Sequence, residues 1–130
     1  MPTLQQLNEL TDKIIGCAIE VHRTLGPGLL ESCYKAALAH ELRLQGLNAL
    51  TEVSVPLTYK GIELENSFRA DIIVENKVII ELKATEQDNK LYTKQLYTYL
   101  RLLDLRVGLL INFNRTRLID GLDRIINNNR

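Results

Sequence analysis

The sequence predicts an α/β (α+β) fold in which helices flank a mixed central sheet. Three observations lead to this fold class: a long amphipathic stretch that ends at Gly-Pro-Gly, a central run of β-forming residues with two turns, and a second helical pattern followed by a short apolar run. The expected order is α-α-β-β-β-α-β. The sequence contains no internal repeat or linker, so we expect residues 1–130 to form one domain.

The first two helices are predicted on either side of a glycine-rich break. Apolar residues recur every three or four positions over residues 4–25, and the Gly-Pro-Gly of residues 26–28 stops that helix. A second helix is expected over residues 30–44, with Gly46 as its stop. Glu31 then lies in the first turn, where an acid complements the helix dipole. Alternatively, the break directs Glu31 toward the middle of the protein.

Three strands are expected next. Residues 52–59, EVSVPLTY, alternate in β-forming side chains and lead through a Lys60-Gly61 turn into residues 62–74. Asn76 marks a second turn, and residues 77–84, KVIIELKA, return as the third strand.

The remaining elements are a helix, a buried strand and a tail. Residues 91–104 have helical spacing, and residues 106–113, RVGLLINF, are typical of a buried strand. The tail is ambiguous, with Gly121 dividing a short strand from a further strand or a helical turn.

Composition excludes several classes of protein. Hydrophobic residues make up 45% of the chain and charged residues 25%, which indicates a globular fold. No apolar run approaches the roughly 20 residues of a membrane helix, and the N-terminus does not resemble a secretion signal. We therefore expect a cytoplasmic protein that does not bind membranes.

The net charge is zero but unevenly distributed along the chain. Residues 1–82 carry 7 Lys and Arg against 11 Asp and Glu, while residues 83–130 carry 9 against 5. A zero total argues against binding nucleic acid by bulk attraction. The basic C-terminal part still allows a local surface that binds phosphate.

Residues 69–84, RADIIVENKVIIELKA, form a predicted hairpin with Asn76 at its tip. One face is apolar, and its cross-strand pairs are Ala70 with Leu82, Ile72 with Ile80 and Val74 with Val78. The other face pairs Asp71 with Glu81, Arg69 with Lys83 and Ile73 with Ile79.

The pairing of Asp71 with Glu81 is unfavourable unless something neutralises it. Facing residues have Cβ atoms roughly 5 Å apart, and like charges so placed destabilise a sheet. A bound divalent cation would offset the repulsion, because hard cations take carboxylate oxygens. Alternatively, Asp71 pairs diagonally with Lys83, and Glu81 with Arg69, in a salt-bridge lattice on a solvated face.

Three further polar residues are candidates whose ordinary explanation is structural. Gln95 and Tyr99 are four positions apart and share one helix face. Such a pair is usually a surface amide beside a tyrosine at the edge of the core. Tyr34 lies one turn after Glu31, in a helical stretch where core packing is the default.

Together these residues resemble a known family. The motif Gly28-x-x-Glu31-x-x-Tyr34 and the charged hairpin are similar to those of the GxxExxY protein family, over nearly the whole chain. That family is identified as part of the PD-(D/E)XK phosphodiesterase superfamily, mostly predicted nucleases. The resemblance implies a restriction-endonuclease-like α-β-β-β-α-β core.

The resemblance also implies a metal site. Asp71 corresponds to the acid of the second core strand, and Glu81-Leu82-Lys83 to the E-x-K motif of the third. Ala70 stands where the superfamily name has a proline. Mg²⁺ or Mn²⁺ held by Asp71, Glu81, the Leu82 carbonyl and Glu31 would stabilise the phosphate and activate water.

The remaining motif residues are expected to act on the substrate. Lys83 would orient the attacking water or stabilise the developing charge, which makes it catalytic beside the three acids. Gln95-x-x-x-Tyr99 resembles the Q-x-x-x-Y motif of RecB-like nucleases. Gln95, Tyr99 and Tyr34 are therefore expected to bind the substrate or support the groups around the metal.

The sequence thus predicts a metal-dependent nuclease, with DNA expected before RNA as its substrate and a homodimer as the form that cuts both strands. Two alternatives remain open. One is a nuclease-fold module with a weak or idle metal site that binds nucleic acid or a partner protein. The other is an interaction domain whose hairpin charges form salt bridges. The presence of Glu31, Asp71, Glu81 and Lys83 in one chain favours the enzyme.

Overall fold

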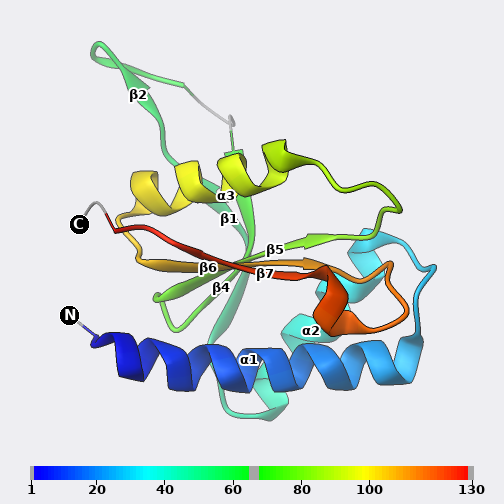
Figure 1. Ribbon diagram of the computed structural model, residues 1–130. Helices are drawn as coiled ribbons and strands as arrows, with labels where there is room; N and C mark the ends of the chain where they lie inside the picture. The colour runs from blue at the N-terminus through cyan, green and yellow to red at the C-terminus, as the bar shows by residue number, and fades with distance from the viewer. Residues whose placement is uncertain (1, 65–67, 129–130) are drawn as a thin grey trace.

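The computed structural model describes residues 2–64 and 68–128 (Figure 1). Its elements are α1 (Leu4–Leu25), α2 (Glu31–Leu44), β1 (Ala49–Val55), β2 (Thr58–Tyr59), β3 (Ile62–Glu63), β4 (Phe68–Val74), β5 (Val78–Lys83), α3 (Lys90–Leu103), β6 (Val107–Asn112), the 3₁₀ turn η1 (Leu118–Gly121) and β7 (Leu122–Ile126). None of the helices in these two segments is long and apolar enough to cross a membrane.

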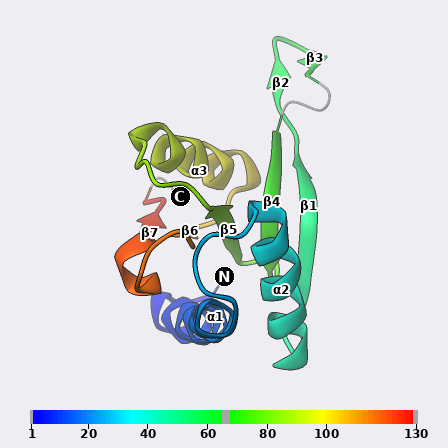
Figure 2. The same ribbon diagram turned by 90° about the vertical axis from the view of Figure 1, so that its right-hand side faces the viewer.

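The central sheet is mixed and has helices on both faces. Its strand order is β1-β4-β5-β6-β7, with β5 and β6 parallel and the other neighbours antiparallel. Helices α1 and α2 cover one face and α3 covers the other (Figures 1 and 2). Each face has its own apolar cluster of buried side chains. The predicted α+β fold with a flanked, mixed sheet is confirmed.

The two N-terminal helices begin and end as the sequence predicts. Thr3 caps α1 in a reciprocal box with Gln6, which satisfies backbone donors of the first turn. The helix stops at Gly26, which has φ 72°, and Gly28 has φ 102°, so both adopt conformations that disfavour a side chain. Helix α2 follows directly and starts at Glu31.

The region between α2 and the hairpin differs from its prediction. The first strand runs from Ala49 to Val55, rather than over residues 52–59, and Pro56 follows it. The Lys60-Gly61 turn joins only the two-residue strands β2 and β3, a ribbon that projects beyond the sheet (Figures 1 and 2). Part of the predicted strand over residues 62–74, namely residues 65–67, lies outside the described residues.

The predicted hairpin register is confirmed near its turn. Ile72 pairs with Ile80, Ile73 with Ile79 and Val74 with Val78. Ala70, however, does not share the face of Ile72 and Val74; it packs in the cluster under α3. The strand alternation is interrupted here: Glu52, between the paired residues Thr51 and Val53 of β1, has φ 54°.

The ambiguous tail forms the 3₁₀ turn η1 followed by the edge strand β7. Gly121 ends the turn where a Cβ atom would meet the backbone oxygen of Asn112 at 2.2 Å. Glycine is therefore required at this point for the chain to approach the end of β6.

Candidate active site

The candidate site lies where β4 and β5 separate. The Asp71 N–H donates to Glu81 Oε1 at 3.0 Å, and the Leu82 N–H donates to Asp71 Oδ2 at 2.9 Å. Each carboxylate thus accepts a hydrogen bond from the backbone of the opposite strand. The two carboxylates lie in the gap where the strands diverge, and we call this gap between Asp71 and Glu81 the fork.

The fork follows from the partners of the two strands. β5 stays parallel to β6 as far as Lys83, while β4 stays paired with β1 as far as Phe68. The direct pairs between β4 and β5 reach only to Ile72 and Ile80. Asp71 and Glu81 are the next residues on each strand, so the sequence places its two acids at the point of divergence.

Burial of these two carboxyl groups disfavours their ionised forms. Glu81 is 5% exposed, and the side chain of Asp71 is 14% exposed. Burial, reinforced by the neighbouring charge of Asp71, raises the pKa of Glu81 to about 8. At neutral pH the pair therefore retains a proton, and it becomes fully ionised only in more alkaline solution or when a cation replaces that proton.

The salt-bridge lattice expected as an alternative is not present. Within residues 2–64 and 68–128, no ion pair joins Asp71 to Lys83 or Glu81 to Arg69. The Lys83 ammonium instead lies 4.4 Å from the ring centroid of Tyr92 on α3. Lys83 is thus held on the α3 side of the fork without neutralising either acid by direct contact.

Lys35 contacts the acid pair, and the sequence prediction missed it. Its Nζ lies 3.6 Å from Asp71 Oδ1 and forms a second ion pair with Glu52. Burial favours the neutral amine, but the contacts with Glu52 and Asp71 outweigh it and raise the pKa of Lys35. The available signal was spacing: Lys35 lies four positions after Glu31 and so on the same helix face.

Glu31 is half-buried at the start of α2 and lies within electrostatic range of the fork. Burial is the main cause that raises the pKa of Glu31; Lys83 opposes this shift and Asp71 adds to it. Glu31 therefore interacts with both the lysine and an acid of the hairpin, as expected if the Gly-Pro-Gly break directs it toward the sheet.

Tyr34 is a core residue that contacts the loop at that break. It is fully buried and stacks on Phe113 with ring centroids 4.5 Å apart. Its hydroxyl donates to the Gly26 carbonyl at 2.5 Å and accepts from the Leu29 N–H at 3.1 Å. The ring of Tyr34 thus lies in the core and its hydroxyl is engaged by the loop that precedes α2, while substrate binding by Tyr34 stays a prediction.

Gln95 and Tyr99 lie on the helix that covers the other side of the fork. Tyr99 is 4% exposed and its ring packs against Phe68, with centroids 5.5 Å apart. Burial, together with the charges of Glu81 and Asp71, raises the pKa of Tyr99 to about 12, so its hydroxyl keeps its proton. Gln95 is half-buried one turn earlier on the same helix.

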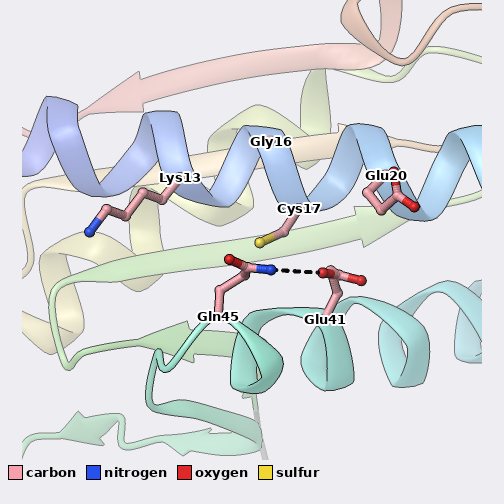
Figure 3. Close-up of a pocket in the computed structure, with 6 residues that line it drawn as sticks. All are labelled: Lys13, Gly16, Cys17, Glu20, Glu41 and Gln45. Carbon is pink, nitrogen blue, oxygen red and sulfur yellow. Dashed lines mark hydrogen bonds between the residues drawn. The ribbon is translucent and has the colours of Figure 1, made fainter.

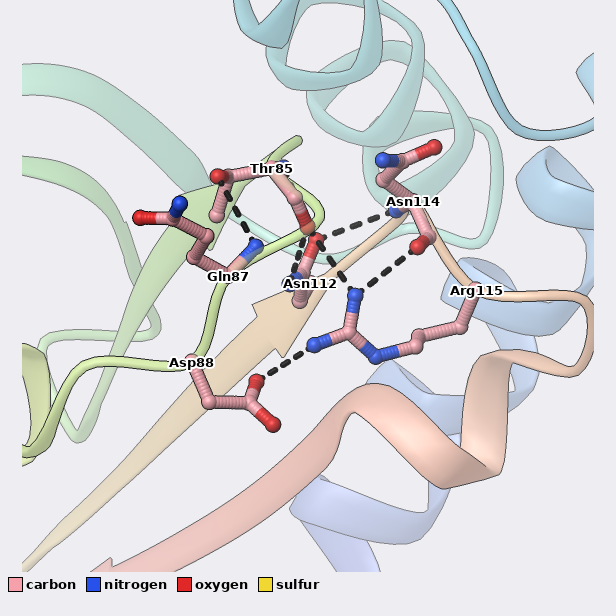
Figure 4. Close-up of polar contacts among 6 residues, drawn as sticks. All are labelled: Thr85, Gln87, Asp88, Asn112, Asn114 and Arg115. Carbon is pink, nitrogen blue, oxygen red and sulfur yellow. Dashed lines mark hydrogen bonds and ion pairs between the residues drawn. The ribbon is translucent and has the colours of Figure 1, made fainter.

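A second polar cluster fixes the chain that leaves β5 (Figure 4). The side chain of Asn112 accepts from the N–H groups of Thr85 and Asn114 and donates to the Thr85 carbonyl. Arg115 donates to the same carbonyl and forms an ion pair with Asp88. This amide cluster, missed from the sequence, anchors the connection to α3 just beyond Lys83.

One cavity is lined by neither member of the acid pair. It has a volume of about 670 Å³ between α1 and α2, and its lining residues are Lys13, Gly16, Cys17, Glu20, Glu41 and Gln45 (Figure 3). Burial, then Glu41, raises the pKa of the Cys17 thiol, which disfavours the reactive thiolate. A smaller cleft of about 280 Å³ includes Lys83 and Tyr92 and therefore adjoins the hairpin motif.

The donor chemistry of the fork fits a hard divalent cation. Asp71 and Glu81 each use one oxygen for a backbone N–H, and their other oxygens accept no backbone hydrogen bond in the described part of the chain. Mg²⁺ is commonly held by one or two carboxylates together with water and substrate phosphate. In the same part of the chain no three His, Cys, Asp or Glu side chains are grouped closely enough for a fuller site.

Comparison with known protein families places the chain. A family model described as the PD-(D/E)XK nuclease superfamily matches residues 8–125. This range includes most of α1, all of α2, the hairpin with its acid pair, and α3. No curated protein and no solved structure matches the chain.

Proposed function

The chain belongs to the PD-(D/E)XK nuclease superfamily, and from this premise we propose that it is a metal-dependent nuclease that hydrolyses phosphodiester bonds. Membership supports a nuclease-type function, and divalent metals are general in this superfamily. The observation that carries the proposal is the buried acid pair at the fork, Asp71 and Glu81, with Lys83 two residues further along β5.

The proposed metal ligands are Asp71, Glu81, the Leu82 carbonyl and Glu31. When bound, Mg²⁺ or Mn²⁺ supplies charge stabilisation to the phosphate and lowers the pKa of water. The hairpin contributes two carboxylates whose positions are fixed by backbone hydrogen bonds from the opposite strand. Glu31 is proposed as the third acid because it stands in the first turn of α2 and the charges of Lys83 and Asp71 influence its pKa.

Lys83 is the proposed catalytic cation. Its contact with the Tyr92 ring holds the ammonium beside the cleft of about 280 Å³ rather than against the acids. From there it orients the attacking water or stabilises charge that develops on the phosphate. Tyr99, which keeps its proton, and Gln95 support the substrate or the carboxylates from α3.

The finer parts of the proposal rest on the sequence. The motif Gly28-x-x-Glu31-x-x-Tyr34 supports placement in the GxxExxY branch, and the basic C-terminal part supports a nucleic-acid partner. From the sequence we also propose that the substrate is DNA rather than RNA and that a homodimer cuts both strands. A single domain over residues 1–130 and a cytoplasmic location are likewise proposed from the sequence.

A module that binds nucleic acid or a partner protein without cleaving it is the second candidate. Two observations favour it: Lys35 lies beside Asp71, and among the described residues no three His, Cys, Asp or Glu side chains are grouped as a metal site. An idle site of this kind would retain the fold and lack turnover.

Incubation with single- and double-stranded DNA and RNA, with Mg²⁺, Mn²⁺ or chelator, tests the proposal. We expect wild-type protein to cleave at least one polymer only when a metal is present, and Lys83→Met to lose at least about a hundredfold in rate while still binding the metal. Binding of a polymer without cleavage by the wild type would favour the idle module. Wild-type rates in Lys83→Met would remove the catalytic role of Lys83.

A further inference from the structure

Lys35 lies at the meeting point of α2 and the two strands that carry Glu52 and Asp71. Helix α2 packs beside β1 and β4 (Figure 2). The ammonium group of Lys35 forms ion pairs with Glu52 on β1 and Asp71 on β4. Its side chain is 21% exposed, compared with 45% for Glu52 and 14% for Asp71. The lysine is thus partly buried between an outer acid and an inner acid.

The strand conformation favours this arrangement. Glu52 and Asp71 lie where the β1–β4 register is interrupted, between the pairs Thr51–Ile72 and Val53–Ala70, and both acids form ion pairs with Lys35. Glu52 also has φ 54°, a left-handed conformation that is unfavourable for a residue with a side chain. Such strained residues persist where surrounding contacts hold them, and at Glu52 the contact is its ion pair with Lys35.

Lys35 and a divalent cation would use the same oxygens. Of the two carboxylate oxygens of Asp71, Oδ2 accepts the Leu82 N–H, and Oδ1 is the one that faces Lys35 Nζ at 3.6 Å. Oδ1 is the Asp71 oxygen that accepts no backbone hydrogen bond in the described residues, so it is the one more available to a metal. Glu52 offers Lys35 an alternative partner that lies further from the fork and is more exposed.

We propose that Lys35 is the built-in counter-cation of the acid pair, that it competes with the divalent cation for Asp71, and that Glu52 holds it when the cation is bound. This inference rests on the proposed metal-dependent function. It assigns to Lys35 and Glu52 a positioning role that sets how tightly the site binds metal. Neither residue touches the reacting atoms.

The test is calorimetric titration of Mn²⁺ into wild type, Lys35→Met, Glu52→Gln and the double variant. We expect Lys35→Met to tighten Mn²⁺ binding at least about tenfold, because a competing charge within 4 Å of Asp71 is removed. Glu52→Gln should weaken Mn²⁺ binding in the wild-type background, because Lys35 loses its ion pair with Glu52 and keeps the one with Asp71. In the Lys35→Met background Glu52→Gln should change the affinity far less.

Two controls separate competition from a general charge effect. Lys77→Met removes the same charge from the exposed turn of the same hairpin and should leave the affinity unchanged. Thermal unfolding in chelator should show Lys35→Met less stable than wild type, with Mn²⁺ restoring the loss. Equal affinities for wild type and Lys35→Met, or additive effects of the two substitutions, would overturn the inference.

The outcomes also distinguish this inference from the proposed function. Metal-dependent cleavage by wild type, with unchanged Mn²⁺ affinity in Lys35→Met, would leave the nuclease standing and remove the role of Lys35. Mn²⁺ binding by Lys35→Met but not by wild type would support the competition and contradict an active wild-type site. Absence of Mn²⁺ binding by every variant would overturn both.

Discussion

The acid pair at the fork and the amide cluster around Asn112 lie next to the same strand, β5, and differ in one chemical respect. In both, side chains provide hydrogen bonds that a backbone ladder would otherwise provide. Asn112 is neutral and both ends of its amide are paired within the cluster. Asp71 and Glu81 are two acids that face each other with little solvent around them.

This difference separates a folding role from a ligand-binding role. A buried amide with all its hydrogen bonds made stabilises the chain and requires no further partner. A buried pair of like charges opposes folding, and its cost appears as the raised pKa of Glu81. The acid pair therefore supports the proposed cation site, while the amide cluster anchors the connection that follows Lys83.

The largest expected effect is on catalysis at the acid pair. Asp71→Asn and Glu81→Gln should each lower metal-dependent cleavage by about a thousandfold, because a bound metal supplies several kcal/mol of stabilisation to the transition state. Both variants keep a side chain able to accept the backbone N–H, so circular dichroism should show the wild-type fold. Cleavage within tenfold of wild type in either variant would place the active site elsewhere.

The amide cluster should respond in stability rather than in chemistry. Asn112→Ala leaves the buried N–H groups of Thr85 and Asn114 without their acceptor, at a cost of about 2–3 kcal/mol in the free energy of unfolding. Urea denaturation measures this loss, and Asn48→Ala at an exposed position is the matched control. If Asn112→Ala instead abolished Mg²⁺ binding in the folded protein, the two clusters would not be separable.

Metal affinity should depend on pH through Glu81. Its pKa of about 8 lies above the ordinary value of 4.5, so metal binding below pH 8 displaces a proton. Affinity should rise by up to about tenfold per pH unit and level off above pH 8. The contribution of Glu81 to the metal-free fold has the opposite sign, because the proton is held more tightly when folded; that stability is full below pH 4.5 and is lost as the pH rises to 8.

Calorimetry at pH 6, 7, 8 and 9, in buffers of different ionisation enthalpy, measures both the affinity and the number of protons released. A metal affinity independent of pH would show that Glu81 is not a ligand, even if a cation binds elsewhere at the fork.

The smallest effect is expected at Glu31. Its influence on the fork is electrostatic, through Lys83 and Asp71, and it makes no contact with them that approaches an ion pair in the described residues. Glu31→Gln should weaken Mg²⁺ binding by about threefold to tenfold and leave the fold intact. An unchanged affinity by calorimetry would return Glu31 to the role of a first-turn acid.

The hairpin was predictable because its pattern is local. Asn76 at the tip and the alternation of apolar residues fix the register over residues 72–80, and that register brings Asp71 and Glu81 together. The helix bounds around Gly-Pro-Gly were predictable for the same reason. The face on which Ala70 lies was not predictable. It depends on the left-handed backbone conformation of Glu52 on the neighbouring strand, and glutamate has no preference for that conformation.

The long-range partners could not be derived from spacing alone. Lys35 contacts Glu52 and Asp71 only after α2 has packed beside β1 and β4. The loop that precedes α2 is held by the hydrogen bond from Tyr34 to Gly26. Asn112 joins segments 27 residues apart through one amide. The spacing of Glu31 and Lys35 places both on one helix face, but the partners of Lys35 and of Asn112 lie far away in sequence and have no periodic relation to them.

Thermal unfolding of wild type and Glu81→Gln at pH 8.5, each with Mg²⁺ and with chelator, tests the central claim most directly. A cation-binding acid pair predicts that Glu81→Gln is more stable than wild type in chelator, since the buried repulsion is gone, and that Mg²⁺ stabilises the wild type alone. A wild type that ignores Mg²⁺ and exceeds Glu81→Gln in stability would make Asp71 and Glu81 a structural pair and contradict the claim.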